Sequence, residues 1–126
     1  MTAPRAGKLP MTTRDLDRAV ATAMGYRVMH RDDGAWIVQD RGAFFAYVDN
    51  SSQVPQWSPT TTPADWVAVV EQMQDLGYTV ELCGSSEGYW HVRFAKDGKW
   101  TEQPTIQDLG VAVCRAALAA VGAARV

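Results

Sequence analysis

GYRV at residues 25–28 and GYTV at residues 77–80 are two copies of one short pattern, and the residues around them repeat as well. Each copy follows a stretch with helical spacing and precedes a turn and a Trp-bearing apolar run, AWIV at 35–38 and YWHV at 89–92. A glycine just after the last helical turn readily takes the positive φ that ends a helix. The sequence therefore predicts the order helix, strand, turn, strand, turn twice.

Three helix starts are predicted by a T-x-x-D pattern, in which the Thr hydroxyl accepts from a first-turn amide and the carboxylate reaches back. The pairs are Thr12 with Asp15, Thr62 with Asp65, and Thr105 with Asp108. The apolar spacing after them predicts helices over 13–24, 62–77 and 109–121. The last helix is apolar on nearly every side except at Arg115, so we expect it to be buried on two sides, between the sheet and the first helix or in a dimer interface.

Period-two alternation and turn residues predict the strands. The expected strands are 26–31, 35–39, 43–48, 78–83, 89–95 and 99–101. The fold class that follows is α+β: an antiparallel sheet of five or six strands with three helices, in an α-β-α layered sandwich built from two α-β-β units plus a C-terminal helix.

Length and composition indicate one globular domain. The chain has 126 residues, 47% of them hydrophobic, and a formal charge of −2, which weakens any case for broad binding to duplex DNA. We expect a flexible tail at 1–11, in which Met11 is a possible start, a domain at 12–122 and a short tail at 123–126. No secretory signal is apparent and the apolar run 109–122 is too short to span a bilayer, so the expected location is the cytoplasm, away from membranes.

Several motifs together resemble one family. They are DLDRAVATAMGY at 15–26, WSPTTTPADW at 57–66, GYTV at 77–80, GYWHVRF at 88–94 and PTIQDLGVAVCRAALAAVG at 104–122, with a Cys-Arg-Ala-Ala-Leu signature at 114–118. The chain looks like the phage ABA-sandwich domain of small phage and prophage proteins over about 12–122. The resemblance implies a phage or prophage gene product acting inside a bacterial cell, with an α-β-α layered fold.

No catalytic or cofactor signature is present: there is no Walker motif, no GxGxxG after a strand, no HExxH and no paired CxxC. We therefore expect no enzyme, no cofactor, no metal site and no catalytic residues. Ser85 or Ser86 near His91 or Cys83 can be drawn as a nucleophile pair, but these serines suit a hairpin turn. Cys114, inside an apolar helix, is expected to be a core residue.

Six residues are the candidate ligand-binding set. Aromatic rings stack on nucleobases and guanidinium groups hold phosphates. The set is Arg27, Arg31, Trp57, His91, Arg93 and Trp100. The alternative is that Trp57 fastens a loop to the core while the arginines solvate a strand edge. The other tryptophans, Trp36, Trp66 and Trp90, fall at positions that the periodicity assigns to the core.

Two functions follow from this set. The first is a non-catalytic binding protein that sequesters a small anionic, nucleotide-like ligand, such as a signal of an anti-phage defence system. The alternative is a protein-binding module that inhibits or redirects a host enzyme, with the same aromatic and Arg side chains as anchors. In either case we expect a homodimer.

Overall fold

The computed structural model of the chain describes residues 12–48, 53–101 and 105–124, and the tail predicted at 1–11 lies outside them. The helices are α1 (Thr13–Ala23), α2 (Pro63–Asp75) and α3 (Leu109–Ala124). The strands are β1 (Arg27–His30), β2 (Trp36–Asp40), β3 (Ala43–Val48), β4 (Thr79–Gly84), β5 (Trp90–Lys96) and β6 (Lys99–Trp100). The predicted element order is confirmed, although α3 continues past the predicted domain end at Gly122 to Ala124.

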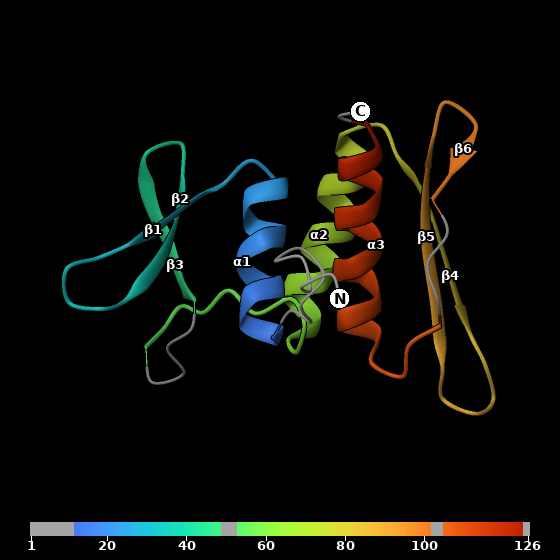
Figure 1. Cartoon of the computed structure of the whole chain (residues 1–126), viewed down its shortest axis with the longest axis horizontal. Helices are drawn as coiled ribbons and strands as arrows, with labels where there is room; N and C mark the ends of the chain where they lie inside the picture. The colour runs from blue at the N-terminus through green and yellow to red at the C-terminus, as the bar shows by residue number, and fades with distance from the viewer. Residues whose placement is uncertain (1–11, 49–52, 102–104, 125–126) are drawn as a thin grey trace, which may run out of the picture.

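The strands form two separate sheets instead of the predicted single sheet. Sheet A has the order β1-β2-β3 and sheet B the order β4-β5-β6, and both are antiparallel. Figure 1 shows the helices as a central layer with one sheet on each side, so the layer order is sheet, helices, sheet. Each three-stranded unit buries its inner face on this layer, and the helices keep the edges of the two sheets apart.

The repeated Gly-Tyr pairs end α1 and α2 in the same way. Gly25 and Gly77 have φ values of +93° and +95°. The amide of Tyr26 donates to the carbonyl of Ala21, and the amide of Tyr78 donates to that of Met73, each at 3.0 Å. These bonds define a Schellman motif, in which the residue after the glycine leaves the helix and turns into the core. Here that residue is a tyrosine both times.

The tyrosines then pack in equivalent ways against the sheets that follow them. The Tyr26 ring stacks on Phe45 of β3 with centroids 5.1 Å apart, and the Tyr78 ring meets Phe94 of β5 edge-on at 6.3 Å. The hydroxyl of Tyr78 also donates to the carbonyl of Ala120 in α3 at 3.3 Å. Each GY pair therefore ends a helix and also anchors the following sheet to the helical layer.

The turns repeat as well. In both units the first hairpin is closed by an amide-to-carbonyl bond of 2.8 Å, from Arg31 to Ala35 and from Ser85 to Tyr89. The second turns, at 41–42 and 97–98, have positive φ at both residues, which is the type I′ geometry that fits the twist of two paired strands. The doubling predicted from GYRV and GYTV thus extends to the turn types.

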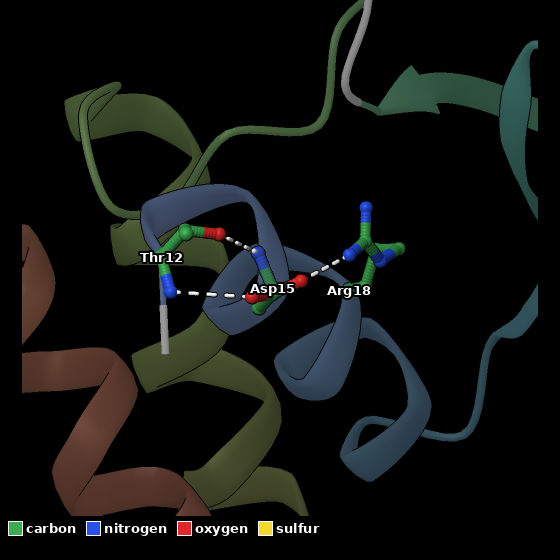
Figure 2. Close-up of polar contacts among 3 residues, drawn as sticks. All are labelled: Thr12, Asp15 and Arg18. Carbon is green, nitrogen blue, oxygen red and sulfur yellow. Dashed lines mark hydrogen bonds and ion pairs between the residues drawn. The ribbon is translucent and has the colours of Figure 1, made fainter. Parts of the chain in front are cut away.

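Only the first T-x-x-D pattern forms a capping box. The Thr12 hydroxyl accepts from the amide of Asp15 at 3.1 Å, and the carboxylate of Asp15 accepts from the amide of Thr12 at 3.2 Å (Figure 2). The same carboxylate pairs with Arg18. The Thr62 side chain makes no cap bond, and α3 is capped by Asp108, which accepts from the amide of Val111 at 3.2 Å. The interpretation of Thr62 and Thr105 as capping residues was therefore wrong.

The helix α3 lies on the side of the helical layer that faces sheet B, with β5 on one side of it and α1 and α2 on the other. Its residues Val113, Cys114, Ala116 and Ala117 have no exposed surface. This confirms the expectation that the last helix is buried on two sides, and it occupies the position between a sheet and the first helix. The small side chains let its neighbours approach closely, while Arg115 lies on its exposed side.

Candidate binding faces

The structure separates the six candidate residues. Arg27 lies in sheet A and Arg31 directly follows its first strand, whereas His91, Arg93 and Trp100 lie in sheet B. The helical layer lies between the two sheets (Figure 1). The sixth candidate, Trp57, is buried in the core. A single pocket built from all six residues is therefore not present.

Trp57 holds a loop segment in the core. Its side chain is 2% exposed, and its indole Nε1 donates to the backbone carbonyl of Asp17 in α1 at 2.9 Å. Its ring meets Tyr26 edge-on and is tilted against Phe45. No face of this ring is open for stacking on a ligand, so including Trp57 in the binding set is corrected: it fastens the loop to the core.

The tryptophans that the periodicity assigned to the core are less buried than Trp57. Trp36, Trp66 and Trp90 are partly buried and pack against the edge of the core. These rings are large enough to cover the core while one edge stays in water. The spacing of apolar residues in a strand or helix identifies a core-facing position, but it does not tell whether the side chain there is partly or fully buried.

Two acidic side chains complete the anchoring of segment 57–60. The carboxylate of Asp17 accepts from the amide of Thr60 at 3.0 Å, and that of Asp65 accepts from the amide of Ser58 at 2.9 Å. Burial raises the pKa of both carboxyl groups, while these hydrogen bonds oppose the rise. The T-x-x-D pattern at Thr62 thus serves the loop before the helix: Asp65 binds Ser58, and the Thr62 hydroxyl lies 2.6 Å from the Ser58 hydroxyl.

Gly110 allows this segment to approach α3. A Cβ atom at this position would lie 2.4 Å from the carbonyl oxygen of Thr60 and 2.7 Å from that of Pro59. The first turn of α3 therefore packs directly on the backbone of the loop.

The outer face of sheet B, called the B face, consists of Glu81, Cys83, His91, Arg93 and Trp100. Strand register places Glu81 opposite Arg93 and Cys83 opposite His91. Arg93 donates from Nε to Glu81 at 2.6 Å, and its guanidinium lies 4.6 Å from the Trp100 ring centroid. The bond from Arg93 lowers the pKa of Glu81. Because Arg93 is already engaged by an acid and an indole, its charge is largely compensated.

The outer face of sheet A, called the A face, is aromatic and basic. It consists of Arg27, Met29, Arg31, Gln39, Phe44 and Tyr47, around the buried Ile37. Phe44 is 47% exposed and meets Tyr47 edge-on with centroids 4.9 Å apart. The guanidinium of Arg31 lies 6.0 Å from the Tyr47 centroid and pairs with Asp33, whose hydrogen bond raises the pKa of Arg31.

Sequence reasoning missed the aromatic pair for a specific reason. Strict alternation would place Phe44 and Tyr47 on opposite faces of β3, since they are an odd number of residues apart. The register shifts between Val38 and Gln39, and this irregularity brings both rings to the A face. The Glu81–Arg93 pair, in contrast, could have been found by counting back from the hairpin turn.

The nucleophile hypothesis has no geometric support. The Ser85 hydroxyl accepts from the amides of Glu87 and Tyr89, at 3.3 and 3.2 Å, and thereby builds the turn. Cys114 is fully buried, and burial raises the pKa of its thiol, so it is the core residue that the sequence indicated. His30 stacks on Trp36 with centroids 4.5 Å apart.

A pocket of about 450 Å³ lies at the N-terminal ends of α2 and α3. Thr60, Trp66 and Asp108 contribute to its wall. None of the six candidate residues lines this pocket.

Among residues 12–48, 53–101 and 105–124, no group of three or more His, Cys, Asp or Glu side chains is arranged to hold a metal ion. No helix in this described part of the chain is long and apolar enough to cross a membrane.

The fold and its faces define a small α+β domain with layered helices and sheets, whose exposed chemistry lies on the outer sheet faces. The model of the phage ABA sandwich domain family matches residues 19–118. The chain belongs to this family, as its motifs indicated. Comparisons with curated proteins and with solved structures gave no match.

Proposed function

We propose that this protein is a non-catalytic protein-binding module that contacts its partner through the A face. The observation that carries the proposal is the exposed ring of Phe44, packed on the half-buried Tyr47, on the sheet face that also carries Arg27 and Arg31. Aromatic and Arg side chains supply most of the energy in protein interfaces because they bury a large area at a small entropic cost. A three-stranded sheet holds them in fixed positions.

The distribution of the candidate residues favours this function over capture of a nucleotide-like anion. Capture requires cationic and aromatic groups to converge on one concave site that encloses the ligand. The candidates lie on opposite sides of the helical layer, Trp57 is buried, and Arg93 is already bonded to Glu81. The A face presents an exposed aromatic ring and two exposed arginines, which suit a partner protein.

The chemistry of the A face indicates what its partner offers. Arg27 is exposed, and Arg31 shares its charge with only one carboxylate among the described residues, that of Asp33. A host protein with an apolar centre and an acidic rim would bury Phe44 and Tyr47 while pairing with the arginines. Such a module inhibits or redirects its target by occupying the target's surface.

The test uses two variants that each remove one exposed ring from an outer sheet face: Phe44→Ala on the A face and Trp100→Ala on the B face, where Trp100 is 39% exposed. Tagged wild type and both variants are used to capture partners from a bacterial host extract, and the partner found is purified and titrated calorimetrically. We expect Phe44→Ala to raise the Kd by about 30-fold, the effect of a typical hot spot of about 2 kcal/mol, and Trp100→Ala to leave it within twofold.

Equal affinities for both variants would remove the A face from the interaction. A thermal-shift screen against linear and cyclic nucleotides tests the competing function directly, because a ligand at a hundred times its Kd stabilises the folded state by about 2.7 kcal/mol. A shift of that size that disappears in Arg93→Ala would establish anion capture on the B face in place of protein binding.

A further inference from the structure

Strand β4 is an open edge of sheet B. Its neighbour β5 is paired on both sides, by β4 on one side and by β6 and a bridge to Ile106 on the other. Within the described residues, β4 pairs with β5 alone. The strand runs from Thr79 to Gly84 without a register shift, so it is a regular edge.

The register tells which backbone groups of β4 face outward. The hairpin is closed by the amide of Ser85 on the carbonyl of Tyr89, which makes this a hydrogen-bonded pair. Hydrogen-bonded and non-bonded pairs alternate along an antiparallel ladder. Glu81 and Cys83 therefore direct their backbone groups to β5, whereas Val80, Leu82 and Gly84 direct their amides and carbonyls to the open side.

The β4 edge lacks the devices that keep a strand from pairing with another chain. Natural edges carry lysine, proline or a bulge, or are covered by another segment. The β3 edge of sheet A is covered in this way, because Tyr47 bonds to Pro55 and Trp57 at 2.8 Å each. On β4, by contrast, Leu82 is 37% exposed and the charged Glu81 is neutralised by Arg93.

We propose that β4 pairs antiparallel with β4 of a second copy of this chain, giving a two-fold symmetric dimer with a continuous six-stranded sheet. The register is centred on Leu82, which lies opposite Leu82 of the second copy, with Val80 opposite Gly84. This register uses all three outward-facing residues. A self-paired strand is the simplest isologous interface, because every backbone donor meets the equivalent acceptor.

Two neighbouring registers are less favourable. Moving the centre to Glu81 would set two carboxylates directly opposite each other, which is destabilising. Moving it to Cys83 would pair Val80 with Ser86, which lies in the hairpin turn. The register centred on Leu82 places Glu81 opposite Cys83 of the second copy, and no like charges then meet directly.

The dimer is independent of the A face. Sheet A lies on the far side of the helical layer from sheet B (Figure 1), so joining two copies through β4 leaves both A faces free. A dimer of this kind would present two identical binding faces, which raises avidity for a partner that has two sites. Phe44→Ala is accordingly expected to remain dimeric although it weakens partner binding.

The first test is the mass in solution, measured by light scattering after size exclusion under reducing conditions over a range of protein concentrations. We expect a dimer for the wild type and a monomer for Leu82→Lys, because a lysine on the edge opposes strand pairing. The control is Val54→Lys, a matching change of an exposed aliphatic residue in the segment beside sheet A, and it is expected to stay dimeric. Circular dichroism confirms that both variants are folded. A monomeric wild type, or a Leu82→Lys dimer, would overturn the proposal.

The second test fixes the register. In the proposed dimer, position 81 and Cys83 of the second copy form a non-hydrogen-bonded pair with Cα atoms about 4.5 Å apart, within the range of a disulfide. Glu81→Cys is expected to become a covalent dimer on mild oxidation. The matched control, Glu81→Cys with Cys83→Ser, keeps only the diagonal pair of thiols introduced at position 81, about 7–8 Å apart, and is expected to cross-link at least tenfold less. Equal cross-linking by both variants would overturn this register.

Discussion

Replacing Gly110 with alanine is expected to lower the free energy of unfolding by about 3 kcal/mol, because the new methyl group has no room. Its Cβ would lie 2.4 Å from the carbonyl oxygen of Thr60, whereas an unstrained carbon-to-oxygen contact is about 3.3 Å. The loop would therefore have to move by about 0.9 Å. Both obstructing oxygens belong to backbone, so no side-chain rotation relieves the contact.

Moving the loop would disrupt the two hydrogen bonds that hold it to α1. The Thr60 amide is bonded to Asp17, and the Trp57 indole is bonded to the backbone of the same residue. Overpacking a tight site costs about 1–3 kcal/mol, and weakening a hydrogen bond adds about 1 kcal/mol. Since a change of 1 kcal/mol moves the Tm of a domain of this size by roughly 4 °C, the expected decrease is about 12 °C.

The matched control is Gly122→Ala in the same helix, where an added Cβ has nothing within 4 Å. Alanine has the higher helix propensity, so this variant is expected to gain up to about 1 kcal/mol. Both variants are unfolded with guanidinium chloride and followed by circular dichroism and tryptophan fluorescence. If Gly110→Ala retains wild-type stability within about 0.5 kcal/mol, the direct packing of α3 on the loop is refuted.

Three further outcomes are expected from unfolding measurements. Thr12→Ala should lose about 1 kcal/mol through the capping box, whereas Thr13→Ala, one residue into α1, should lose less; equal losses would argue against the cap. Gly25→Ala and Gly77→Ala should each lose about 1–2 kcal/mol, since both positions have positive φ, and a neutral effect at either would contradict the Schellman ending. Burial raises the pKa of Asp17 above its unfolded value, so its contribution to stability is greatest at low pH and is lost as the pH rises through the folded pKa. The stability of the wild type relative to Asp17→Asn should therefore fall as the pH rises above about 4, the usual pKa of an aspartate, and a rise would show that the pKa is depressed.

Local features of the fold could be predicted from the sequence because their causes are local. The Gly-Tyr helix ends, the hairpin turns and the Thr12 cap each depend on a few adjacent residues, and each is confirmed. The number of sheets depends on which strand edges meet, and neither unit's own sequence specifies that. The apolar helix α3 determines the number of sheets. Because it must be buried on two sides, it lies in a layer between the two units, and their strands then form two separate sheets.

The candidate site was harder to predict for a related reason. Trp57 lies in a long polar segment, so its neighbours gave no sign of burial, and its partners Asp17 and Tyr26 are distant in the sequence. The A face depends on the register shift beside Val38, which reverses the alternation that would otherwise assign each side chain to a face. In both cases a contact between distant residues overrides a local pattern.

The two copies of the repeated unit have the same scaffold and different outer surfaces. Their helix ends, turn types and tyrosine anchors agree, so the scaffold by itself cannot distinguish a binding face from a passive one. What differs is the charge balance and the aromatic content. The B face pairs Arg93 with Glu81, next to an open edge that lacks protection. The A face carries the Phe44–Tyr47 ring pair and the exposed Arg27, next to an edge covered by the loop. The two proposals, association with a second copy through β4 and partner binding through the A face, therefore divide the roles between the two units of one fold.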